Sequence, residues 1–285
     1  MRSIWNGFVG FLTFIGKHFK ALLLLLILVV IFAPSFTPQK EPNLMRIDLK
    51  GVITDSSSVL KQIQKASKSE SIKGILLYVD SPGGSVSPSV EISYAIRSLA
   101  KEKQVVAYAA GSMASGSYYA SAFSNYIVAN PASMIGSIGV IAQVPNVEEL
   151  AKKIGISEQV VSAGEYKQAG TFMREWTPKE RESLEIVVND IYDLFVNDVA
   201  IARGLDVEDK DAFANARVFI GEKAKDIGLV DSVGVLSDAT KILITSSNIT
   251  EPIWAEPDLA DVFVKKLGLE VTSQIGTLLY GVKFF

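Results

Sequence analysis

The sequence predicts an α/β fold with a largely parallel sheet, preceded by one N-terminal transmembrane helix. Short apolar runs of strand length alternate along the chain with stretches in which apolar residues recur at helical spacing. Continuous apolar runs are typical of parallel strands buried on both faces, and their alternation with helices indicates an α/β architecture. A separate uncharged apolar run, from Ala21 to Phe36, lies near the N-terminus and is the basis of the predicted membrane helix.

The predicted membrane anchor occupies residues 21–36. Its 16 residues are slightly fewer than the roughly 20 that span a bilayer, but flanking residues can extend the helix. Because Lys and Arg cluster before the run, the positive-inside rule places residues 1–20 in the cytoplasm. The rest of the chain is then expected on the periplasmic or extracellular side of the inner (cytoplasmic) membrane. A cleaved signal peptide is the alternative, and a weak cleavage pattern disfavours it.

The chain after the anchor divides into three predicted parts. Residues 37–43 contain Pro38 and Pro42 among polar residues and are predicted to be a linker. A soluble domain is expected over residues 44–249. The tail, residues 250–285, combines apolar positions at helical spacing with an apolar end. Three roles are open for this tail: packing on a neighbouring subunit, contact with the bilayer, or occupancy of a groove.

Hydrophobic periodicity places the elements of the soluble domain in order along the chain. Strands are expected where apolar residues form continuous or alternating runs, at 44–49, 74–79, 105–110, 126–129, 138–142 and 159–162. Helices are expected where apolar residues recur every three or four positions, at 59–66, 92–100, 118–123, 177–203 and 220–227.

The helix at 177–203 has the clearest boundaries. Thr177 is suited to the N-cap, Pro178 to the first helical position, and Glu180 to the third position of a capping box. Gly204 follows the last periodic residue and is expected to end the helix.

The composition excludes several kinds of chemistry. The chain has no cysteine and a single histidine, His18, which precedes the apolar run. Chemistry after residue 36 must therefore proceed without imidazole or thiol, which removes the Ser-His-Asp triad, the Cys-His pair and most zinc sites. We expect no metal and no cofactor. The net charge is −3 and no long basic block follows residue 36, so we expect no nucleic-acid partner.

A glycine-rich turn follows the predicted strand at 74–79. It reads Asp80-Ser81-Pro82-Gly83-Gly84 and precedes a helix. Adjacent glycines allow a ligand to approach the backbone closely, and such a turn can direct N–H groups at a developing oxyanion. The alternative is an ordinary strand-to-helix turn, which this motif alone favours.

A second small-residue segment, Gly111 to Ser117, follows the next predicted strand. Ser115 lies where a helix is about to begin, so its side chain would be exposed at the end of the sheet, beside unpaired N–H groups. Ser112, Ser117 and Ser121 are rival nucleophiles. The alternative is that these small residues only permit close helix–sheet packing.

A third segment places Lys167 in a loop between Gly164 and Gly170, just past the predicted strand at 159–162. Most lysines are solvated surface groups. A lysine that acts as a base has to be removed from water, because burial lowers the pKa of an ammonium group toward neutrality. With imidazole and thiol absent, lysine is the remaining side chain able to deprotonate a serine near neutral pH.

Together these segments, with Gly-Ser-Ile-Gly-Val at 136–140, resemble the short form of the signal peptide peptidase A family. These are membrane-anchored serine proteases of the ClpP/crotonase-like superfamily, and the resemblance covers about Leu44 to Val233. It implies a ClpP/crotonase-like fold of repeated β-β-α units. By position it assigns Ser115 as the nucleophile and Lys167 as the general base, with oxyanion N–H groups from Gly83 and Gly116. One departure is Ser117, where the family usually has glycine.

The resemblance also implies an activity and partners. The expected reaction is peptide hydrolysis by a Ser/Lys dyad, with cleaved signal peptides and other apolar segments as substrates. The expected partners are these peptides, the lipid bilayer and other copies of the chain in a ring. Because Lys167 lies 52 residues after Ser115, the two need not belong to one chain, and both arrangements remain open.

Three other functions are compatible with parts of the pattern. An anchored ClpP-class protease for one specific membrane protein would carry the same motifs. A crotonase-type acyl-CoA enzyme uses similar oxyanion turns, but it leaves Ser115 and Lys167 without a role. A non-catalytic membrane scaffold on this fold has no need of an intact dyad.

Overall fold

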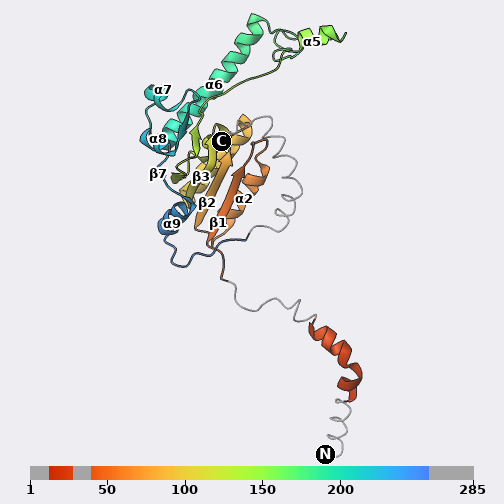
Figure 1. Cartoon of the computed structure of the whole chain (residues 1–285), viewed down its shortest axis with the longest axis vertical. Helices are drawn as coiled ribbons and strands as arrows, with labels where there is room; N and C mark the ends of the chain where they lie inside the picture. The colour runs from red at the N-terminus through yellow and green to blue at the C-terminus, as the bar shows by residue number, and fades with distance from the viewer. Residues whose placement is uncertain (1–12, 28–39, 257–285) are drawn as a thin grey trace, which may run out of the picture. The chain divides into compact units, whose positions relative to one another are not determined.

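The computed structural model describes residues 13–27 and 40–256, which belong to two compact units, Met1–Glu41 and Pro42–Phe285 (Figure 1). Residues 13–27 of the first unit are helical. Within the described ranges, no helix combines the length and apolar character needed to cross a bilayer. Most of the predicted anchor (28–36), the start of the predicted linker (37–39) and most of the tail (257–285) lie outside the described residues.

The strands of the described residues form one seven-stranded sheet, and the predicted α/β fold with a mainly parallel sheet is confirmed. Five parallel strands follow the order β1 (Leu44–Lys50), β2 (Gly74–Ser81), β3 (Gln104–Ala114), β4 (Tyr126–Ala129) and β7 (Ser232–Val233). The other two are β5 (Met134–Gly136), which is parallel to β3, and β6 (Val218–Ile220), which is antiparallel to β5.

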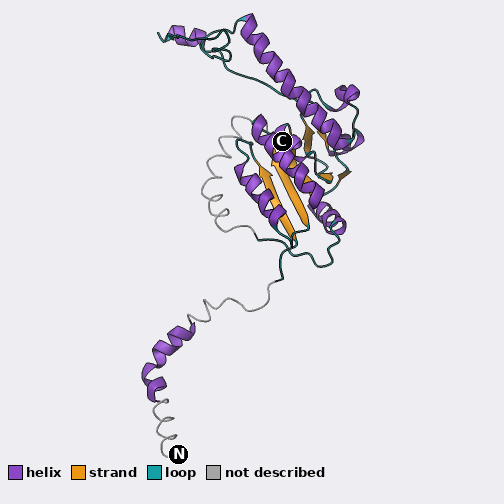
Figure 2. Cartoon of the chain, turned by 180° about the vertical axis from the view of Figure 1, so that it is seen from behind, coloured by secondary structure: helices purple, strands orange, loops and turns teal. Residues whose placement is uncertain are grey.

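Helices cover both faces of this sheet (Figure 2). Along β2, Ile75 and Leu77 pack with α2 (Ser57–Lys68) and α3 (Val86–Glu102) in one core cluster. Leu76, between them, packs with α9 (Leu236–Ser246) in the second cluster on the opposite face. The continuous apolar runs of the central strands are explained by this burial on both faces.

The remaining helices lie between the strands. They are α4 (Gly116–Ser121), α5 (Glu148–Lys153), α6 (Pro178–Arg203), a 3₁₀ turn (Val207–Asp209), α7 (Lys210–Phe213) and α8 (Gly221–Asp226).

The long helix α6 begins and ends as its sequence predicts. The Thr177 hydroxyl accepts a hydrogen bond from the Glu180 N–H, the Glu180 carboxylate accepts one from the Thr177 N–H, and Gly204 ends the helix in a left-handed conformation. With 26 residues the helix is about 39 Å long. Only its C-terminal half is packed into the core, through residues such as Phe195 and Val199. In its N-terminal half more than half of the surface of Ile186 is exposed.

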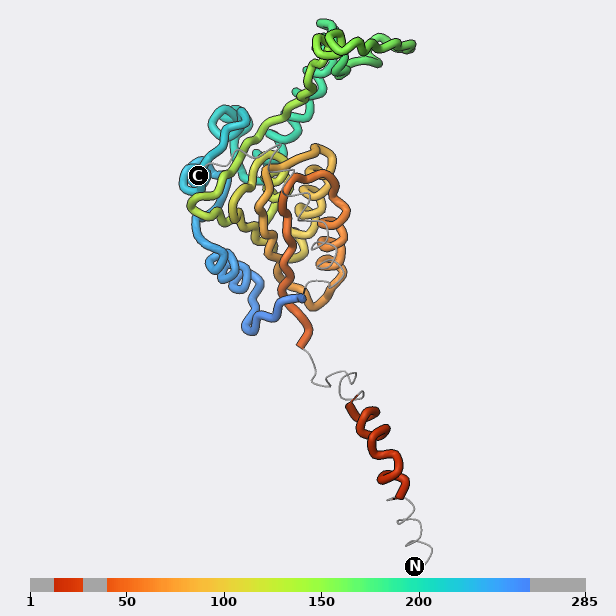
Figure 3. The backbone as a smooth tube through the Cα atoms, turned by 45° about the vertical axis from the view of Figure 1, so that its right-hand side comes forward, coloured from red at the N-terminus to blue at the C-terminus, as the bar shows by residue number. Residues whose placement is uncertain are grey.

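Residues 140–177 and the N-terminal half of α6 extend away from the sheet as an arm (Figure 3). The predicted strands at 138–142 and 159–162 fall at the start of this arm and within it, and both predictions are wrong: neither segment is a strand. The reason is visible in their side chains. Ile141 is 81% exposed and Val161 is fully exposed, so among residues 13–27 and 40–256 no strand or helix covers these apolar side chains.

Candidate active site

The two glycine- and serine-rich segments meet at the carboxyl edge of the sheet. They begin in the last residues of β2 and β3 and continue into the turns after these strands. The two strands are parallel neighbours, with Ser81 in register with Met113. Because parallel strands end at the same edge, the turn after β2 lies against the turn after β3. Gly83 shows how close this approach is. A Cβ on Gly83 would lie 2.7 Å from the Gly116 nitrogen and 2.8 Å from the Ser115 Cβ. Gly83 also has a φ of +96°, a conformation that favours glycine.

Ser115 occupies a strained turn between β3 and α4. Its φ of 53° and ψ of −127° lie outside the regions that non-glycine residues ordinarily adopt. Such a conformation costs about 1–3 kcal/mol and is found mainly at functional sites. The turn is held by a hydrogen bond of 2.7 Å from the Ser115 N–H to the Gly136 carbonyl. The hydroxyl makes no capping bond to α4, and the side chain is partly exposed. A serine on a sharp strand-to-helix turn is typical of hydrolase nucleophiles.

The rival serines are less accessible than Ser115. Ser117 and Ser121 are fully buried, and Ser112 is buried with a hydroxyl that has no hydrogen-bond partner. Ser121 donates to the Ser117 carbonyl at 2.7 Å. Burial leaves these three hydroxyls without access to a peptide from solvent, which favours Ser115 as the nucleophile.

Ser117 joins the two turns of the site. Its hydroxyl accepts from the Ala114 N–H at 2.8 Å and is 2.6 Å from the Ser81 carbonyl, to which it donates. Ser117 therefore connects the end of β3, one residue before Ser115, to the start of the Gly83 turn. The sequence presented Ser117 as a rival nucleophile and as a departure from glycine. It did not show this connecting role, because the contacts of Ser117 depend on β2 and β3 being neighbours.

The backbone N–H groups around Ser115 differ in their availability. The Gly83 N–H donates to the Ser81 hydroxyl at 3.2 Å. The Gly83 carbonyl is held by the Ile53 N–H at 2.8 Å, which fixes the peptide that also carries the Gly84 N–H. A Cβ on Gly116 would lie 3.4 Å from the Gly84 nitrogen. Gly84 is therefore a further candidate donor beside the predicted Gly83 and Gly116.

The helix after Ser115 is fastened to α6. The Tyr119 hydroxyl donates to the buried Asp198 carboxylate at 2.5 Å, and its ring stacks on Phe195 at 4.5 Å. Burial, and then the hydrogen bond to Asp198, raise the pKa of Tyr119 well above its ordinary value, so the hydroxyl keeps its proton. These contacts attach the serine turn to the C-terminal half of α6.

Lys167 lies apart from Ser115 within one chain. It is exposed, in a loop of turns at residues 163–170 rather than directly after a strand. This loop contacts the first turn of α6 near Glu180, whereas the serine turn contacts α6 near Phe195. These contact points are separated by 195 − 180 = 15 residues, or roughly 20 Å along the helix axis. The structure thus brings Gly83, Ser115 and Gly116 together and leaves Lys167 at the other end of α6.

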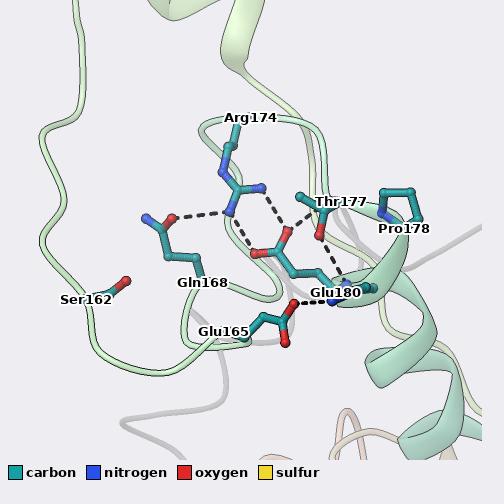
Figure 4. A pocket seen from close by; sticks show the side chains of 8 residues that line it. Ser162, Glu165, Gln168, Arg174, Thr177, Pro178 and Glu180 are labelled. Atoms are coloured by element: carbon teal, nitrogen blue, oxygen red, sulfur yellow. Dashed lines mark hydrogen bonds and ion pairs between the residues drawn. The ribbon is translucent and has the colours of Figure 1, made fainter.

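A shallow pocket of about 590 Å³ lies beside the Lys167 loop (Figure 4). Its lining includes Arg174 and Glu180, joined by an ion pair of 2.7 Å, together with Gln168 and Glu165 from the loop. Sequence reasoning predicted Glu180 as a capping residue but did not identify Arg174. Across residues 13–27 and 40–256, no group of three or more His, Asp or Glu side chains is placed to hold a metal ion.

Comparison with known proteins adds independent information. Residues 97–250 match the family model described as peptidase family S49. A Methanocaldococcus jannaschii protein that carries the name "putative protease" is 37% identical over 234 residues, covering 80% of this chain and 75% of that protein. A Synechocystis protein with the same designation is 36% identical, covering 75% and 78%. The Arabidopsis thaliana protein named "Serine protease SPPA, chloroplastic" is 31% identical, covering 80% of this chain and 34% of its own length.

Proposed function

The chain belongs to peptidase family S49, and on this premise we propose that it is a membrane-anchored serine endopeptidase with a Ser/Lys dyad. The observation that carries the proposal is Ser115 itself: a strained, partly exposed serine, in contact with the backbone of Gly83 and Gly116. The relatives' names, which include serine protease and signal peptide peptidase, support the same reaction class. We also propose that the domain has a ClpP/crotonase-like fold of repeated β-β-α units, and that a transmembrane helix precedes it in the chain.

The proposed reaction has two stages. Lys167, in its neutral form, takes the Ser115 proton as Oγ attacks the peptide carbonyl carbon, and the carbonyl oxygen becomes an oxyanion. The Gly83 and Gly116 N–H groups stabilise this charge, with Gly84 as a further donor. The lysine ammonium returns its proton to the leaving amine as the C–N bond breaks. Water, deprotonated by Lys167, then attacks the acyl carbon. The ester bond to Ser115 Oγ breaks, Oγ takes back a proton from the lysine, and the second product leaves with a new carboxyl group.

The substrates we propose are cleaved signal peptides and other apolar peptide segments. An anchored domain would meet them at the bilayer surface, and an extended peptide can pair with exposed backbone while pockets take alternate side chains. A protease for one specific membrane protein remains the second candidate, since it would use the same residues.

A serine-directed acylating probe tests the proposed function. The intact protein in detergent is treated with a fluorophosphonate, and the modified residue is found by peptide mass spectrometry. We expect a single adduct, on Ser115. An unlabelled protein that retains its fold would support the non-catalytic scaffold instead.

We further propose that the dyad forms between neighbouring copies in a homo-oligomeric ring. Two observations support this: Lys167 is exposed, whereas a general base requires a desolvated amine, and the arm presents apolar side chains such as Ile141, Val161 and Ile186 to solvent. A second copy that packs on the arm would bury both the Lys167 amine and these apolar side chains.

Subunit mixing tests the shared site. Ser115→Ala and Lys167→Ala proteins are each expected to be inactive, and mixing them under conditions of subunit exchange should restore activity. About a quarter of randomly assembled sites would pair an intact serine with an intact lysine. No recovery, with exchange confirmed by differently tagged copies, would leave the dyad within one chain.

The membrane orientation is also a proposal. With residues 1–20 in the cytoplasm and the catalytic domain outside, protease added to intact spheroplasts should digest or release the domain. Digestion only after lysis would reverse the assignment.

A further inference from the structure

The loop that carries Lys167 is fastened on one side to the start of α6 and on the other side to Arg174, which precedes this helix. Two residues before Lys167, the Glu165 carboxylate accepts from the Lys179 ammonium at 2.6 Å. One residue after it, the Gln168 amide oxygen accepts from the Arg174 guanidinium at 3.2 Å. Figure 4 shows the Glu165 and Gln168 side chains on this loop beside the first turn of the helix. The loop is therefore held beside the start of α6 through side chains from both of its flanks.

Arg174 is the centre of this network. It donates two hydrogen bonds to the Glu180 carboxylate, at 2.7 and 2.8 Å, in addition to the one that reaches Gln168. Only 4% of the Glu180 side chain is exposed, and its carboxylate also accepts from the Thr177 N–H at 2.9 Å. Two parallel bonds between a planar guanidinium and a carboxylate fix both groups in direction as well as distance.

The ion pair of Arg174 with Glu180 keeps both of its charges near neutral pH. The hydrogen bonds from Arg174, followed by the backbone bond from Thr177, lower the pKa of Glu180 from 4.5 to about 2. A lowered pKa means that the contribution of Glu180 is fully present above pH 4.5 and is lost as the pH falls toward 2. Glu180 therefore remains an anion, paired with Arg174, throughout any assay near neutrality.

The exposed contact is weaker than the one through Arg174. The Lys179 and Glu165 side chains are 67% and 56% exposed, and exposed ion pairs of this kind contribute little. The Arg174 pair is shielded by its buried carboxylate partner. The contact through Arg174 is therefore better able to hold the loop in place than the exposed ion pair between Lys179 and Glu165.

We propose that Arg174 is a positioning residue, which fixes Lys167 relative to α6 through Gln168 and the ion pair with Glu180. The inference rests on the proposed role of Lys167 as general base. A base must lie within hydrogen-bond distance of the serine it deprotonates, and a loop without helix or strand structure does not ensure this by itself. Arg174 connects the loop to the 26-residue helix α6 and does not itself contact the reacting atoms.

The Arg174→Ala variant of the full assembled enzyme tests the proposal. A misplacement of about 1 Å can cost on the order of 100-fold in rate, so we expect kcat to fall about 100-fold with KM changed less than about twofold. Arg174→Lys should recover only part of the rate, because an ammonium cannot form the paired bonds. Added guanidinium should partly rescue Arg174→Ala and have no effect on Lys167→Ala. The matched control, Lys179→Ala, removes a positive charge from the first turn of α6, close in sequence to Arg174, and should keep kcat within about threefold.

Hydrogen–deuterium exchange gives a readout that does not require activity. The Lys167 N–H donates to the Gly164 carbonyl at 3.2 Å and the Ala169 N–H to the Tyr166 carbonyl at 3.1 Å. In Arg174→Ala these amides should exchange about tenfold faster, with those of the sheet unchanged. If Arg174→Ala does not fold, Gln168→Ala removes the loop contact and leaves the ion pair, and its kcat should fall several-fold.

The outcomes separate this inference from the proposed function. Wild-type kcat and wild-type exchange in Arg174→Ala, with Ser115 labelled normally by the probe, would overturn the positioning role alone. A wild-type protein that the probe does not label at Ser115 would overturn the proposed function, and the positioning role with it.

Discussion

Replacing Ser115 by alanine is expected to remove peptide hydrolysis almost completely. Loss of a serine nucleophile typically lowers kcat by about 10⁴-fold or more, because no other group forms the acyl-enzyme. The measurement is cleavage of an apolar fluorogenic peptide by detergent-solubilised protein. The fold should be retained, because the Ser115 hydroxyl makes no capping hydrogen bond to α4 that alanine would remove.

Alanine variants of two neighbouring serines are the controls for Ser115→Ala. Ser112→Ala deletes a buried hydroxyl that has no partner and should leave activity near the wild-type level. Ser117→Ala deletes the hydroxyl that joins Ala114 to Ser81, so it should cost about 1–3 kcal/mol of stability and keep most of the activity. Full activity in Ser115→Ala would rule out the mechanism.

Replacing Lys167 is expected to have the second largest effect. General-base catalysis contributes about 10²–10⁴-fold, so Lys167→Ala should lose at least about 100-fold in kcat. Lys167→Arg should be as inactive, because a guanidinium stays protonated and cannot accept the serine proton.

Lys152→Ala is the control for these lysine variants. Lys152 is exposed on the same arm, where it pairs with Glu148 and Glu149, so its loss should leave the rate unchanged. An active Lys167→Arg enzyme would exclude Lys167 as the base, whatever the result with alanine.

Local signals in the sequence predicted the central part of the fold well. The start of α6 required only Thr177, Pro178 and Glu180, whose capping bonds form within four residues. The runs of β2 and β3 were recognisable because both faces of these strands are buried in this chain. Because β2 and β3 are parallel neighbours, the turns after them meet, and Gly83 lies beside Ser115.

The errors have a common physical cause. Hydrophobic patterns record that a side chain avoids water, not which molecule covers it. Ile141 and Val161 therefore resembled strand residues, although no strand in the described part of the chain packs against them. The short pair formed by β5 and β6 had no such signal, since each strand has three residues.

The site contains features that no linear motif shows. The positive φ of Ser115, the contact between Tyr119 and Asp198, and the reach of Arg174 to Gln168 all depend on chain segments meeting in space. Arg174 and Glu180 are six residues apart, so the sequence could suggest an ion pair at the start of the helix. It could not show that Arg174 also contacts the loop of Lys167.

The separation of Ser115 from Lys167 along α6 has a consequence for inheritance. If two copies share each site, every subunit contributes a serine to one site and a lysine to another. An allele that lacks only Ser115, expressed equally with the normal allele, would then leave about half of the sites intact. An allele that lacks both residues would leave about a quarter, because each defective subunit disables two sites. A single-chain dyad would leave half in both cases, so the degree of dominance would distinguish the two arrangements in living cells.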